Sequence, residues 1–516
     1  MISIFKTISG LRCYLNLYRH NQKIGLVPTM GALHIGHLSL IKRAIQENDL
    51  VVVSIFVNPL QFGPQEDLTK YPRTLETDLQ LCEQQGVNVV FAPSVNELYP
   101  NSDQITIIYP PEDMINVLCG KIRKGHFQGV NTVVNKLFNI VQPNQVYFGQ
   151  KDAQQVAIIQ KMITDLNLPI NMITCPTIRE ESGLAFSSRN QYLTSEQKQQ
   201  ATVLYRGLQQ AKQLFFRGER KSNVLIKIVE EEIKLVKQVE VEYIELVEPN
   251  TLRPLTQITE KGLLAIAAKI GTTRLIDNMI LTERKLIIAI DGPAGAGKST
   301  VARKVAQKLG LLYLDTGAMY RALTWLVLES GIDINDQPSI VELASNCQIK
   351  LVTIDDPQIP TRVWINEQEV TDKIRNLTVT SQVSKIAAIP EVRIEMVKQQ
   401  KNWGQKGKIV AEGRDIGTHV FPDAELKIFL TATVQERALR RLQDLQNQGE
   451  IDVKLEELQQ TIQKRDDQDS NRKVAPLQKA EDAIEIITDG LSITDVVNQI
   501  INLYNQRLNQ SLNQIN

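Results

Sequence analysis

The stretch KLIIAIDGPAGAGKST, residues 285–300, decides the fold of the second half of the chain. It opens with an apolar, β-branched run typical of a buried strand and continues through a glycine-rich turn into a helical pattern. The turn fits G-x-x-x-x-G-K-[ST] from Gly292 to Ser299. A strand before the motif and a helix after it are the context that the motif requires. The stretch therefore predicts a nucleotide-binding α/β domain that begins near residue 285.

The residue types in this turn suit the phosphates of a nucleotide. Glycines allow backbone N–H groups to close around a phosphate, and a lysine offers a positive charge to the β- and γ-phosphates. The Ser299 hydroxyl can ligate Mg²⁺. The alternative, a tight turn with an incidental lysine, is disfavoured by the strand, turn and helix together. The predicted ATP-binding residues are Gly292, Gly295, Gly297, Lys298, Ser299 and Thr300, and Lys298 is also a predicted catalytic residue.

Length and composition narrow the classes of protein. The 516 residues exceed one compact core, so roughly two to four domains are expected. Basic and acidic residues balance at 58 each, which disfavours nucleic-acid binding. The sequence has no apolar run long enough to span a membrane and no signal-peptide pattern at its start. Because the five cysteines are scattered, we expect reduced thiols in a cytoplasmic protein.

The first half predicts a second α/β domain. Short β-branched runs alternate with amphipathic stretches, a pattern typical of a parallel sheet with helical crossovers. After about residue 194 the pattern changes to two helices and three strand-like segments, which indicates a smaller α+β subdomain. The expected strands are 24–27, 51–57, 87–91, 145–148 and 170–174, and the expected helices are 195–216 and 222–237. The expected domains are 1–279 (about 1–190 and about 191–279) and 280–516.

The segment VPTMGALHIGHLSL, residues 27–40, holds two of the five histidines of the chain. His34 and His37 are three residues apart, so they share one face of the first helical turn. The helix N-terminus, its backbone N–H groups and two imidazoles together can stabilise the charge of a triphosphate. Single histidines are more often structural, but H-x-G-H favours phosphate binding.

Four further segments carry polar side chains suited to a nucleotide site. They are FVNPLQF (56–62), KIRKGHFQGV (121–130), FGQKDAQQ (148–155) and FSSRN (186–190). All but the second are expected just past predicted strands, whose carboxyl ends form the ligand crevice of a doubly wound sheet.

Together these motifs resemble pantothenate synthetases (pantoate–β-alanine ligases) over about residues 1–279. The resemblance implies a Rossmann-like nucleotidyltransferase sheet of the H-x-G-H type. It also implies that pantoate attacks the α-phosphate of ATP to give pantoyl adenylate, and that β-alanine then displaces AMP. A homodimer formed through this domain is a further expectation.

The same resemblance implies the roles of individual residues. His37 is the proton-donor candidate, and His34 and Lys151 are also predicted to be catalytic. The residues expected to bind ATP are Met30, Gly31, Ala32, Leu33, His34, Ile35, Gly36, His37, Gly149, Gln150, Lys151, Asp152, Ile178, Phe186, Ser187, Ser188 and Arg189. Gln61 and Gln155, supported by Asn58, are expected to orient pantoate and β-alanine. Asp78 is a weak Mg²⁺-ligand candidate, and a surface helix carboxylate is the favoured alternative. His126 either closes over the nucleotide or decorates the loop.

The second half resembles bacterial cytidylate kinases from Leu286 to about Tyr504. The motifs LDTGAMYRA (314–322), EGRDIGTHVFPDA (412–424) and RDDQDSNR (465–472) follow the P-loop in family order. The resemblance implies a P-loop nucleoside monophosphate kinase that transfers the γ-phosphate of ATP to CMP or dCMP. The segment 349–370 is expected to be an insertion of short strands in the monophosphate-binding region.

This resemblance also implies a set of CMP-binding residues: Thr316, Arg321, Ser384, Arg393, Arg414, Asp415, Arg465, Asp469 and Arg472. Carboxylates accept from the cytosine amine and guanidinium groups match phosphate oxygens. Residues 433–463 would form the lid over ATP, with Arg437, Arg440 and Arg441 on one helix; an ordinary charged helix face is the alternative for these arginines.

The sequence thus predicts one chain with two enzyme activities. The expected partners are ATP with Mg²⁺, pantoate, β-alanine and CMP or dCMP, with no nucleic acid and no membrane. One alternative is that one domain is active and the other is a regulatory nucleotide-binding module. Another, an H-x-G-H cytidylyltransferase, leaves FVNPLQF and FGQKDAQQ unexplained.

Overall fold

A computed structural model describes residues 2–64, 66, 68–100, 104–282, 285–353, 361–404, 407–447, 454–471 and 475–513. The chain divides into two compact units, Met1–Glu283 and Arg284–Asn516. Strand β9 runs from Thr273 to Thr282, so the division predicted at residues 279/280 lies within a strand. No helix in the described part of the chain is long and apolar enough to span a membrane.

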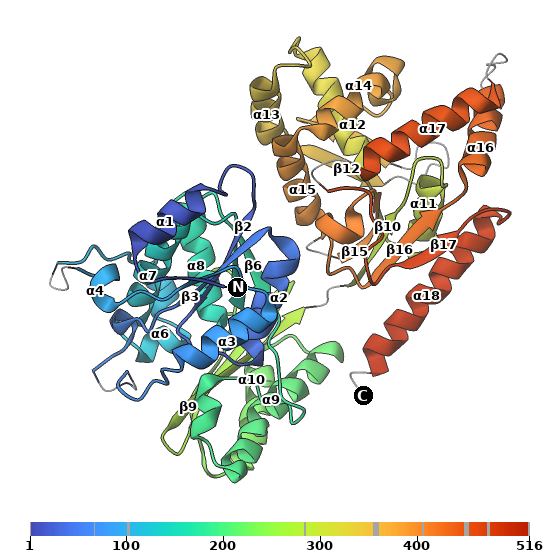
Figure 1. Ribbon diagram of the computed structural model, residues 1–516. Helices are drawn as coiled ribbons and strands as arrows, with labels where there is room; N and C mark the ends of the chain where they lie inside the picture. The colour runs from blue at the N-terminus through green and yellow to red at the C-terminus, as the bar shows by residue number, and fades with distance from the viewer. Residues whose placement is uncertain are drawn as a thin grey trace. The chain divides into compact units, whose positions relative to one another are not determined.

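The first unit is built on a six-stranded parallel sheet in the order β1-β4-β3-β2-β5-β6 (Figure 1). The strands are β1 (Ser3–Phe5), β2 (Ile24–Thr29), β3 (Leu50–Ile55), β4 (Val89–Phe91), β5 (Gln145–Gly149) and β6 (Asn171–Cys175). The structure confirms the five predicted strands. The additional strand β1 pairs only with β4 at the sheet edge. It has just three residues, too few to show a period.

Helices cover both faces of this sheet because its strands alternate apolar side chains between the faces. Leu26 and Val52 pack against α1 (Ile8–Asn16), α7 (His126–Val141) and α8 (Ala153–Asp165). Val27 and Val53 pack against α2 (Ile35–Glu47) and α3 (Leu75–Gln85). Shorter helices are α4 (Val95–Leu98), α5 (Glu112–Ile115) and α6 (Leu118–Ile122). The sheet is therefore buried, and polar groups gather at its carboxyl edge.

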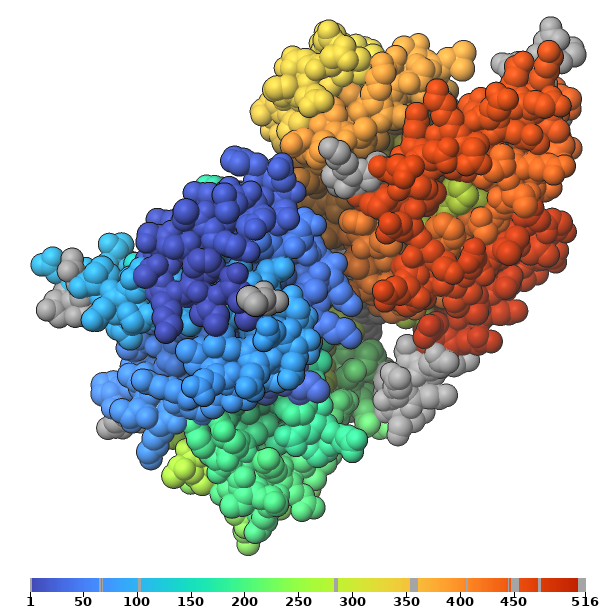
Figure 2. Space-filling model, in the orientation of Figure 1, coloured from blue at the N-terminus to red at the C-terminus, as the bar shows by residue number. Residues whose placement is uncertain are grey.

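A subdomain completes the first unit, as predicted. It comprises α9 (Ser195–Phe216), α10 (Ser222–Lys234) and an antiparallel sheet of β7 (Val239–Val247), β8 (Lys261–Ile270) and β9. Helix α9 has the predicted bounds because Thr194 and Gln197 form a capping box at its start. One face of β9 packs on α9 and α10, and the other face packs on α6 and α8 of the nucleotide-binding part. The green residues of the subdomain lie against the blue residues of that part in Figure 2.

The second unit has a five-stranded parallel sheet in the order β11-β15-β10-β16-β17. Its strands are β10 (Lys285–Asp291), β11 (Leu312–Asp315), β15 (Gly407–Gly413), β16 (Leu426–Thr431) and β17 (Ile484–Ile487). Helices α11 (Lys298–Leu309) and α18 (Ile493–Asn513) cover one face. Helices α12 (Thr316–Glu329), α13 (Gln337–Asn346), α14 (Leu377–Ala388) and α15 (Pro390–Gly404) contribute to the core on the other face. The P-loop stretch supplies the central strand β10, which explains its continuous apolar run.

Two further segments match the predicted organisation. Residues 349–370 contain the antiparallel strands β12 (Ile349–Thr353), β13 (Thr361–Ile365) and β14 (Gln368–Glu369). Helices α16 (Val434–Asn447) and α17 (Leu455–Ser470) form a pair in the predicted lid region. In Figure 2, yellow-green residues from the start of the unit lie in a hollow bordered by the orange-red residues of this pair.

Candidate functional site

The first unit contains a cavity of about 240 Å³ at the carboxyl ends of its central strands. Residues at or after the ends of β2, β3, β5 and β6 line it, as expected for a doubly wound sheet. Of the predicted site residues, the cavity is lined by Met30, His34, Gly36, His37, Asn58, Gln61, Gly149, Lys151, Asp152, Gln155, Ile178, Phe186, Ser187, Ser188 and Arg189. Gly31, Ala32, Leu33, Ile35 and Gln150 do not line it.

The turn between β2 and α2 is held by Asp78. Its carboxylate accepts hydrogen bonds from the backbone N–H groups of Ala32 (3.0 Å) and Leu33 (2.8 Å) and from the Thr74 hydroxyl (3.2 Å). Gly31 and Ala32 have φ angles of 80° and 51°, a costly conformation for Ala32. The alternative of a surface carboxylate was wrong, since Asp78 is 1% exposed. Asp78 instead fixes the turn that leads into the two histidines.

The rings of His34 and His37 lie close together at the start of α2, with centroids 4.1 Å apart and planes tilted by 37°. The Nδ1 atom of His34 accepts from the N–H of Gly36 (3.1 Å), and Nδ1 of His37 accepts from the N–H of His34 (3.3 Å). Because both Nδ1 atoms are acceptors, both neutral rings carry their proton on Nε2. Burial and the nearby Lys151 lower the pKa of His34 to about 4, and burial and His34 lower the pKa of His37 to about 3. Two neutral N–H donors thus flank the cavity near neutral pH.

Gln61 is positioned by a buried amide network. Asn58, 1% exposed, donates from Nδ2 to the Gln61 side-chain oxygen (3.2 Å) and to the Gly129 carbonyl (3.1 Å). Its Oδ1 accepts from the Tyr99 hydroxyl (3.0 Å). A Cβ at position 129 would lie 2.2 Å from the Leu60 carbonyl oxygen, so the close approach of α7 requires glycine here. Asn58 therefore supports Gln61, while the Gln61 amide reaches the cavity.

The basic loop predicted at residues 121–130 is hydrogen-bonded to the segment that carries Gln61. Arg123 forms a two-pronged ion pair with Glu66 (2.6 and 2.7 Å) and donates to Nε2 of His126 (2.9 Å), whose Nδ1 lies 2.8 Å from the Gln61 carbonyl oxygen. Burial and Arg123 lower the pKa of His126 to about 4. The loop-decoration alternative is wrong, because His126 begins α7 and is buried.

The FSSRN segment differs from its predicted placement. Strand β6 ends at Cys175, whereas the segment begins at Phe186, after an isolated bridge between Arg179 and Ala185. It still reaches the cavity, where the Phe186 ring lies 6.3 Å from the His34 ring. A folded-back loop, rather than a strand end, delivers these residues.

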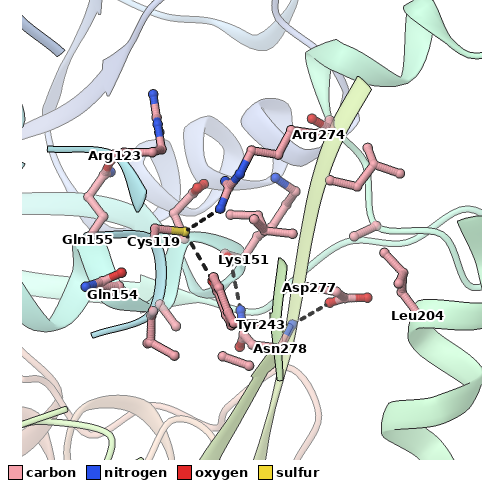
Figure 3. Close-up of a pocket in the computed structure, with 18 of the residues that line it drawn as sticks. Cys119, Arg123, Lys151, Gln154, Gln155, Leu204, Tyr243, Arg274, Asp277 and Asn278 are labelled. Carbon is pink, nitrogen blue, oxygen red and sulfur yellow. Dashed lines mark hydrogen bonds between the residues drawn. The ribbon is translucent and has the colours of Figure 1, made fainter. Parts of the chain in front are cut away.

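A smaller cavity of about 80 Å³ adjoins this site and shares Arg123, Lys151 and Gln155 with it (Figure 3). Strands β7 and β9 contribute to its wall. Here the Cys119 thiol lies 3.1 Å from the Tyr243 hydroxyl and 3.4 Å from an Arg274 nitrogen. The subdomain thus reaches the nucleotide-binding part beside Lys151.

In the second unit, the P-loop surrounds a buried lysine. A Cβ at Gly292 would lie 1.9 Å from the Leu430 carbonyl oxygen, so only glycine fits at the start of the loop. Lys298 is 7% exposed and donates to the Pro293 carbonyl (2.8 Å). Burial and the positive Arg414 lower the pKa of Lys298 to about 7. An anionic phosphate placed here would favour the charged ammonium.

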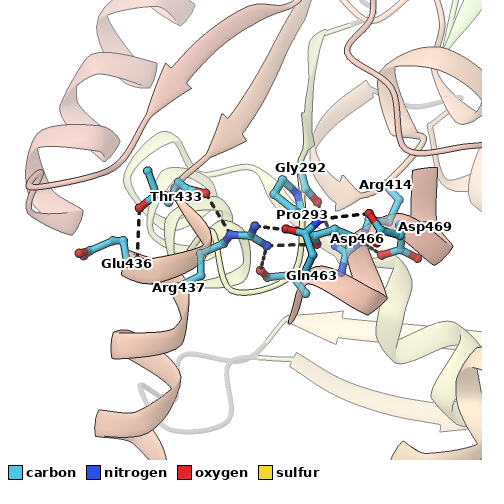
Figure 4. Close-up of polar contacts among 12 residues, drawn as sticks. Gly292, Pro293, Arg414, Thr433, Glu436, Arg437, Gln463, Asp466 and Asp469 are labelled. Atoms are coloured by element: carbon cyan, nitrogen blue, oxygen red, sulfur yellow. Dashed lines mark hydrogen bonds and ion pairs between the residues drawn. The ribbon is translucent and has the colours of Figure 1, made fainter. Parts of the chain in front are cut away.

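Three of the predicted CMP-binding arginines are each paired with a carboxylate. Arg321 contacts Asp315 (3.0 Å), and Arg393 contacts Asp415 (2.6 Å). Arg414 contacts Asp469 (2.8 Å) and donates to the Gly292 carbonyl (3.1 Å), as Figure 4 shows. Guanidinium groups match phosphate oxygens as well as carboxylates.

Other predicted acceptor residues are less closely grouped. The Thr316 hydroxyl donates to the Glu412 carbonyl (2.7 Å). Ser384 is exposed on α14 and Arg465 is exposed on α17. Arg472 lies outside the described residues.

Arg437 on α16 also contacts the P-loop. It is 3% exposed, pairs with Asp466 of α17 through both terminal nitrogens (2.6 and 3.1 Å), and donates to the Ala294 carbonyl (3.0 Å; Figure 4). Arg440 pairs with Glu436 and bonds to Thr488, whereas Arg441 is exposed. The charged-face alternative is therefore wrong for Arg437.

Comparisons with known proteins match both halves of the chain. A family model for pantoate–β-alanine ligases matches residues 3–280, and one for cytidylate kinases matches residues 288–506. A bifunctional pantoate ligase/cytidylate kinase of Trichormus variabilis is 60% identical, with 98% of this chain and 99% of that protein covered. Its Synechocystis counterpart is 56% identical, with the same coverage.

This chain belongs to the bifunctional pantoate ligase/cytidylate kinase family. Its ligase unit is similar to a crystal structure of pantothenate synthetase from Thermus thermophilus, with a TM-score of 0.52 and 42% identity. That match covers 54% of this chain and 99% of the other. Since both families are enzymes, the alternatives of a regulatory module and of a cytidylyltransferase are not favoured.

The sequence did not predict several residues that hold the ligase site or the kinase site in place. In the ligase unit these are Arg123 and Glu66, and in the kinase unit Asp291 and Glu412. Asp291 accepts from the N–H groups of Ile416 and Gly417 (2.8 and 2.7 Å), and burial raises its pKa to about 6. Asp291 directly precedes the P-loop and Glu412 precedes GRDIG, so proximity to a motif was the available signal. No group of three His, Cys, Asp or Glu that could hold a metal occurs among the described residues.

Proposed function

We propose that the ligase unit condenses pantoate with β-alanine through a pantoyl adenylate, and that the kinase unit transfers the γ-phosphate of ATP to CMP or dCMP. The observation that supports this is that each unit has its own group of side chains suited to phosphates: the neutral His34 and His37 with the cationic Lys151 around one cavity, and Lys298 with Arg414 at the P-loop. Two ATP molecules are therefore cleaved at different bonds.

In the ligase reaction, the pantoate carboxylate attacks the α-phosphate and pyrophosphate leaves. The Nε2–H groups of His34 and His37 donate to phosphate oxygens, and Lys151 neutralises charge. Gln61 and Gln155 orient pantoate with neutral amides, which do not overstabilise its resting carboxylate. The amine of β-alanine then attacks the adenylate carbonyl and releases AMP.

In the kinase reaction, a CMP phosphate oxygen attacks the γ-phosphate. Lys298 stabilises the charge of the transferring group, while Arg321 and Arg414 exchange their carboxylate partners for the acceptor phosphate. Arg393, Asp415 and Ser384 hold the cytosine edge, with Thr316 nearby. Arg465, Asp469 and Arg472 serve ribose and phosphate.

Mg²⁺ is the proposed companion of ATP in both units. In the kinase unit the hydroxyl of Ser299, which follows Lys298 at the start of α11, is a hard oxygen donor that suits this ion. Bound there, Mg²⁺ would neutralise phosphate charge. In the ligase unit the oxygens of Asp78 are engaged by three donors, so we propose that the ion is held by ATP phosphates rather than by Asp78.

The test supplies the purified chain with ATP and either pantoate plus β-alanine or CMP, and measures AMP and ADP separately. Lys298→Ala should abolish only CMP-dependent ADP formation, because Lys298 lies in the kinase P-loop. His37→Ala and Gln61→Ala should reduce only AMP formation. Loss of both activities in any one variant would contradict two independent sites.

We also propose a cellular location and an oligomeric state for this protein. All five cysteines are free thiols, which supports a reducing, cytoplasmic location. A homodimer through the ligase unit is tested by sedimentation of the full chain.

A further inference from the structure

Strand β9 of the subdomain carries the adjacent polar residues Asp277 and Asn278, which are 5% and 6% exposed. Asn278 donates from Nδ2 to the backbone carbonyls of Gln150 (3.0 Å) and Lys151 (2.9 Å), and its Oδ1 accepts from the Gln150 side chain (3.3 Å). Figure 3 shows Asn278 directed at Lys151 across the wall of the smaller cavity. The amide of Asn278 thus fastens the FGQK segment to strand β9 of the subdomain.

Asp277 holds a second segment. It forms a two-pronged ion pair with Arg179 (2.6 and 2.8 Å), and the Arg179 guanidinium also donates to the Gly183 carbonyl (3.1 Å). The guanidinium lies 4.0 Å from the ring centroid of Tyr205 on α9. Arg179 bridges to Ala185, directly before Phe186. The ion pair therefore fastens the loop that folds back to deliver Ser187, Ser188 and Arg189.

The period of the strand explains how neighbouring residues reach different segments. Side chains of a strand alternate between its faces. Leu275 and Leu281 share the face of Asp277 and pack toward α9, whereas Ile276 and Ile280 share the face of Asn278 and pack toward the nucleotide-binding part. One short stretch of β9 can therefore fasten two loops that lie far apart in the sequence.

We propose that Asp277 and Asn278 are positioning residues of the ligase reaction, which align the Lys151 and Ser187–Arg189 segments on the triphosphate of ATP. This inference rests on the proposed roles of those segments. We call the hydrogen bonds of Asn278 to Gln150 and Lys151, and the ion pair of Asp277 with Arg179, the two clamps. Each clamp joins a side chain of the subdomain to the nucleotide-binding part. Neither Asp277 nor Asn278 lines the larger cavity, so each acts through the loop that it holds.

The main variant is Asn278→Asp, which keeps the shape but replaces two N–H donors with a carboxylate that faces two carbonyls. We expect the KM for ATP to rise about tenfold in pantoate-dependent ATP–pyrophosphate exchange, the scale of one or two lost hydrogen bonds. The KM for β-alanine should stay within about twofold in the full reaction. CMP kinase activity of the same full chain serves as an internal control and should not change.

A second pair of variants separates positioning from stability. Asp277→Asn weakens the Arg179 ion pair and should also raise the KM for ATP. Glu232→Gln is the matched control, because Glu232 is 9% exposed and pairs with Arg206 (2.8 Å) within the subdomain, away from both loops. It should lower the thermal midpoint without raising the KM for ATP.

Two results would overturn the inference. One is an unchanged KM for ATP in the folded fraction of Asn278→Asp. The other is a rise in KM for Glu232→Gln equal to that of the clamp variants. Lys151→Ala tests the role of Lys151 separately from that of Asn278: if it leaves the KM for ATP unchanged, the proposed role of Lys151 is wrong. If Lys151→Ala raises it and Asn278→Asp does not, only the clamp fails.

Discussion

At the residue scale, the ligase unit keeps three imidazoles neutral. His34, His37 and His126 each have a pKa lowered chiefly by burial, and nearby cations, Lys151 or Arg123, lower it further. Each ring also has a hydrogen-bonding partner on the backbone that selects one tautomer. A site that binds a polyanion thereby uses neutral donors beside a few cations, which limits repulsion among positive charges before ATP arrives.

This arrangement predicts an acid-sensitive ligase unit. In the unfolded chain these imidazoles take up protons as the pH falls through about 6.5. In the folded unit the rings of His34 and His126 stay neutral until the pH reaches about 4. The free energy of unfolding is therefore fully retained above about pH 6.5. It falls as the pH drops toward 4, by at most about 1.4 kcal/mol per pH unit for each ring.

Urea unfolding followed by circular dichroism between pH 7 and 4.5 measures this effect. His34→Asn should flatten the pH dependence by about one proton, since asparagine can still cap α2. His20→Asn, at an exposed position, is the control and should leave the slope unchanged. An unaltered slope in His34→Asn would contradict the assignment.

At the element scale, one guanidinium group, that of Arg437, connects α16, α17 and the P-loop of the kinase unit. Arg437 bonds to the carbonyls of Ala432 and Ala294 and to Asp466. The five donors of arginine make this possible in one plane, whereas lysine offers a single ammonium on a flexible stem. The register of the helix pair over the P-loop therefore depends on this side chain.

We predict that Arg437→Lys lowers kcat/KM for ATP in the kinase reaction at least about tenfold, because several buried hydrogen bonds are lost. Arg441→Lys, on the exposed side of the same helix, is the matched control and should retain activity. Steady-state kinetics with CMP as acceptor measures both variants. Equal activity of the two variants would show that the kinase reaction does not require the hydrogen bonds of the Arg437 guanidinium.

At the scale of the whole molecule, the two units have separate cores and can be observed separately. All three tryptophans, Trp325, Trp364 and Trp403, lie in the kinase unit. Tryptophan fluorescence therefore reports the unfolding of that unit alone, while circular dichroism reports both.

Ligand binding should stabilise each unit selectively. CMP at about 100 times its Kd should raise the free energy of unfolding of the kinase unit by about 2.7 kcal/mol, as seen by fluorescence. Pantoate should leave the fluorescence transition in place and shift only the transition detected by circular dichroism. A fluorescence shift with pantoate would show that the units unfold as one.

The sequence by itself determined the elements and the motifs. Local patterns predicted five strands of the first sheet, helix 195–216 and the P-loop, because period, capping residues and glycine positions act over a few residues. Most of the ligase-site residues that these patterns predicted line one cavity in the structure.

Only the tertiary structure decided which side chains hold the loops in place. Asp78 bonds to amides 45 and 46 positions earlier, and Asn278 bonds to carbonyls 127 and 128 positions earlier. No local period or motif links such residues. These residues are paired because folding packs distant segments of the chain together, and buried backbone groups there need hydrogen-bonding partners from any part of the chain.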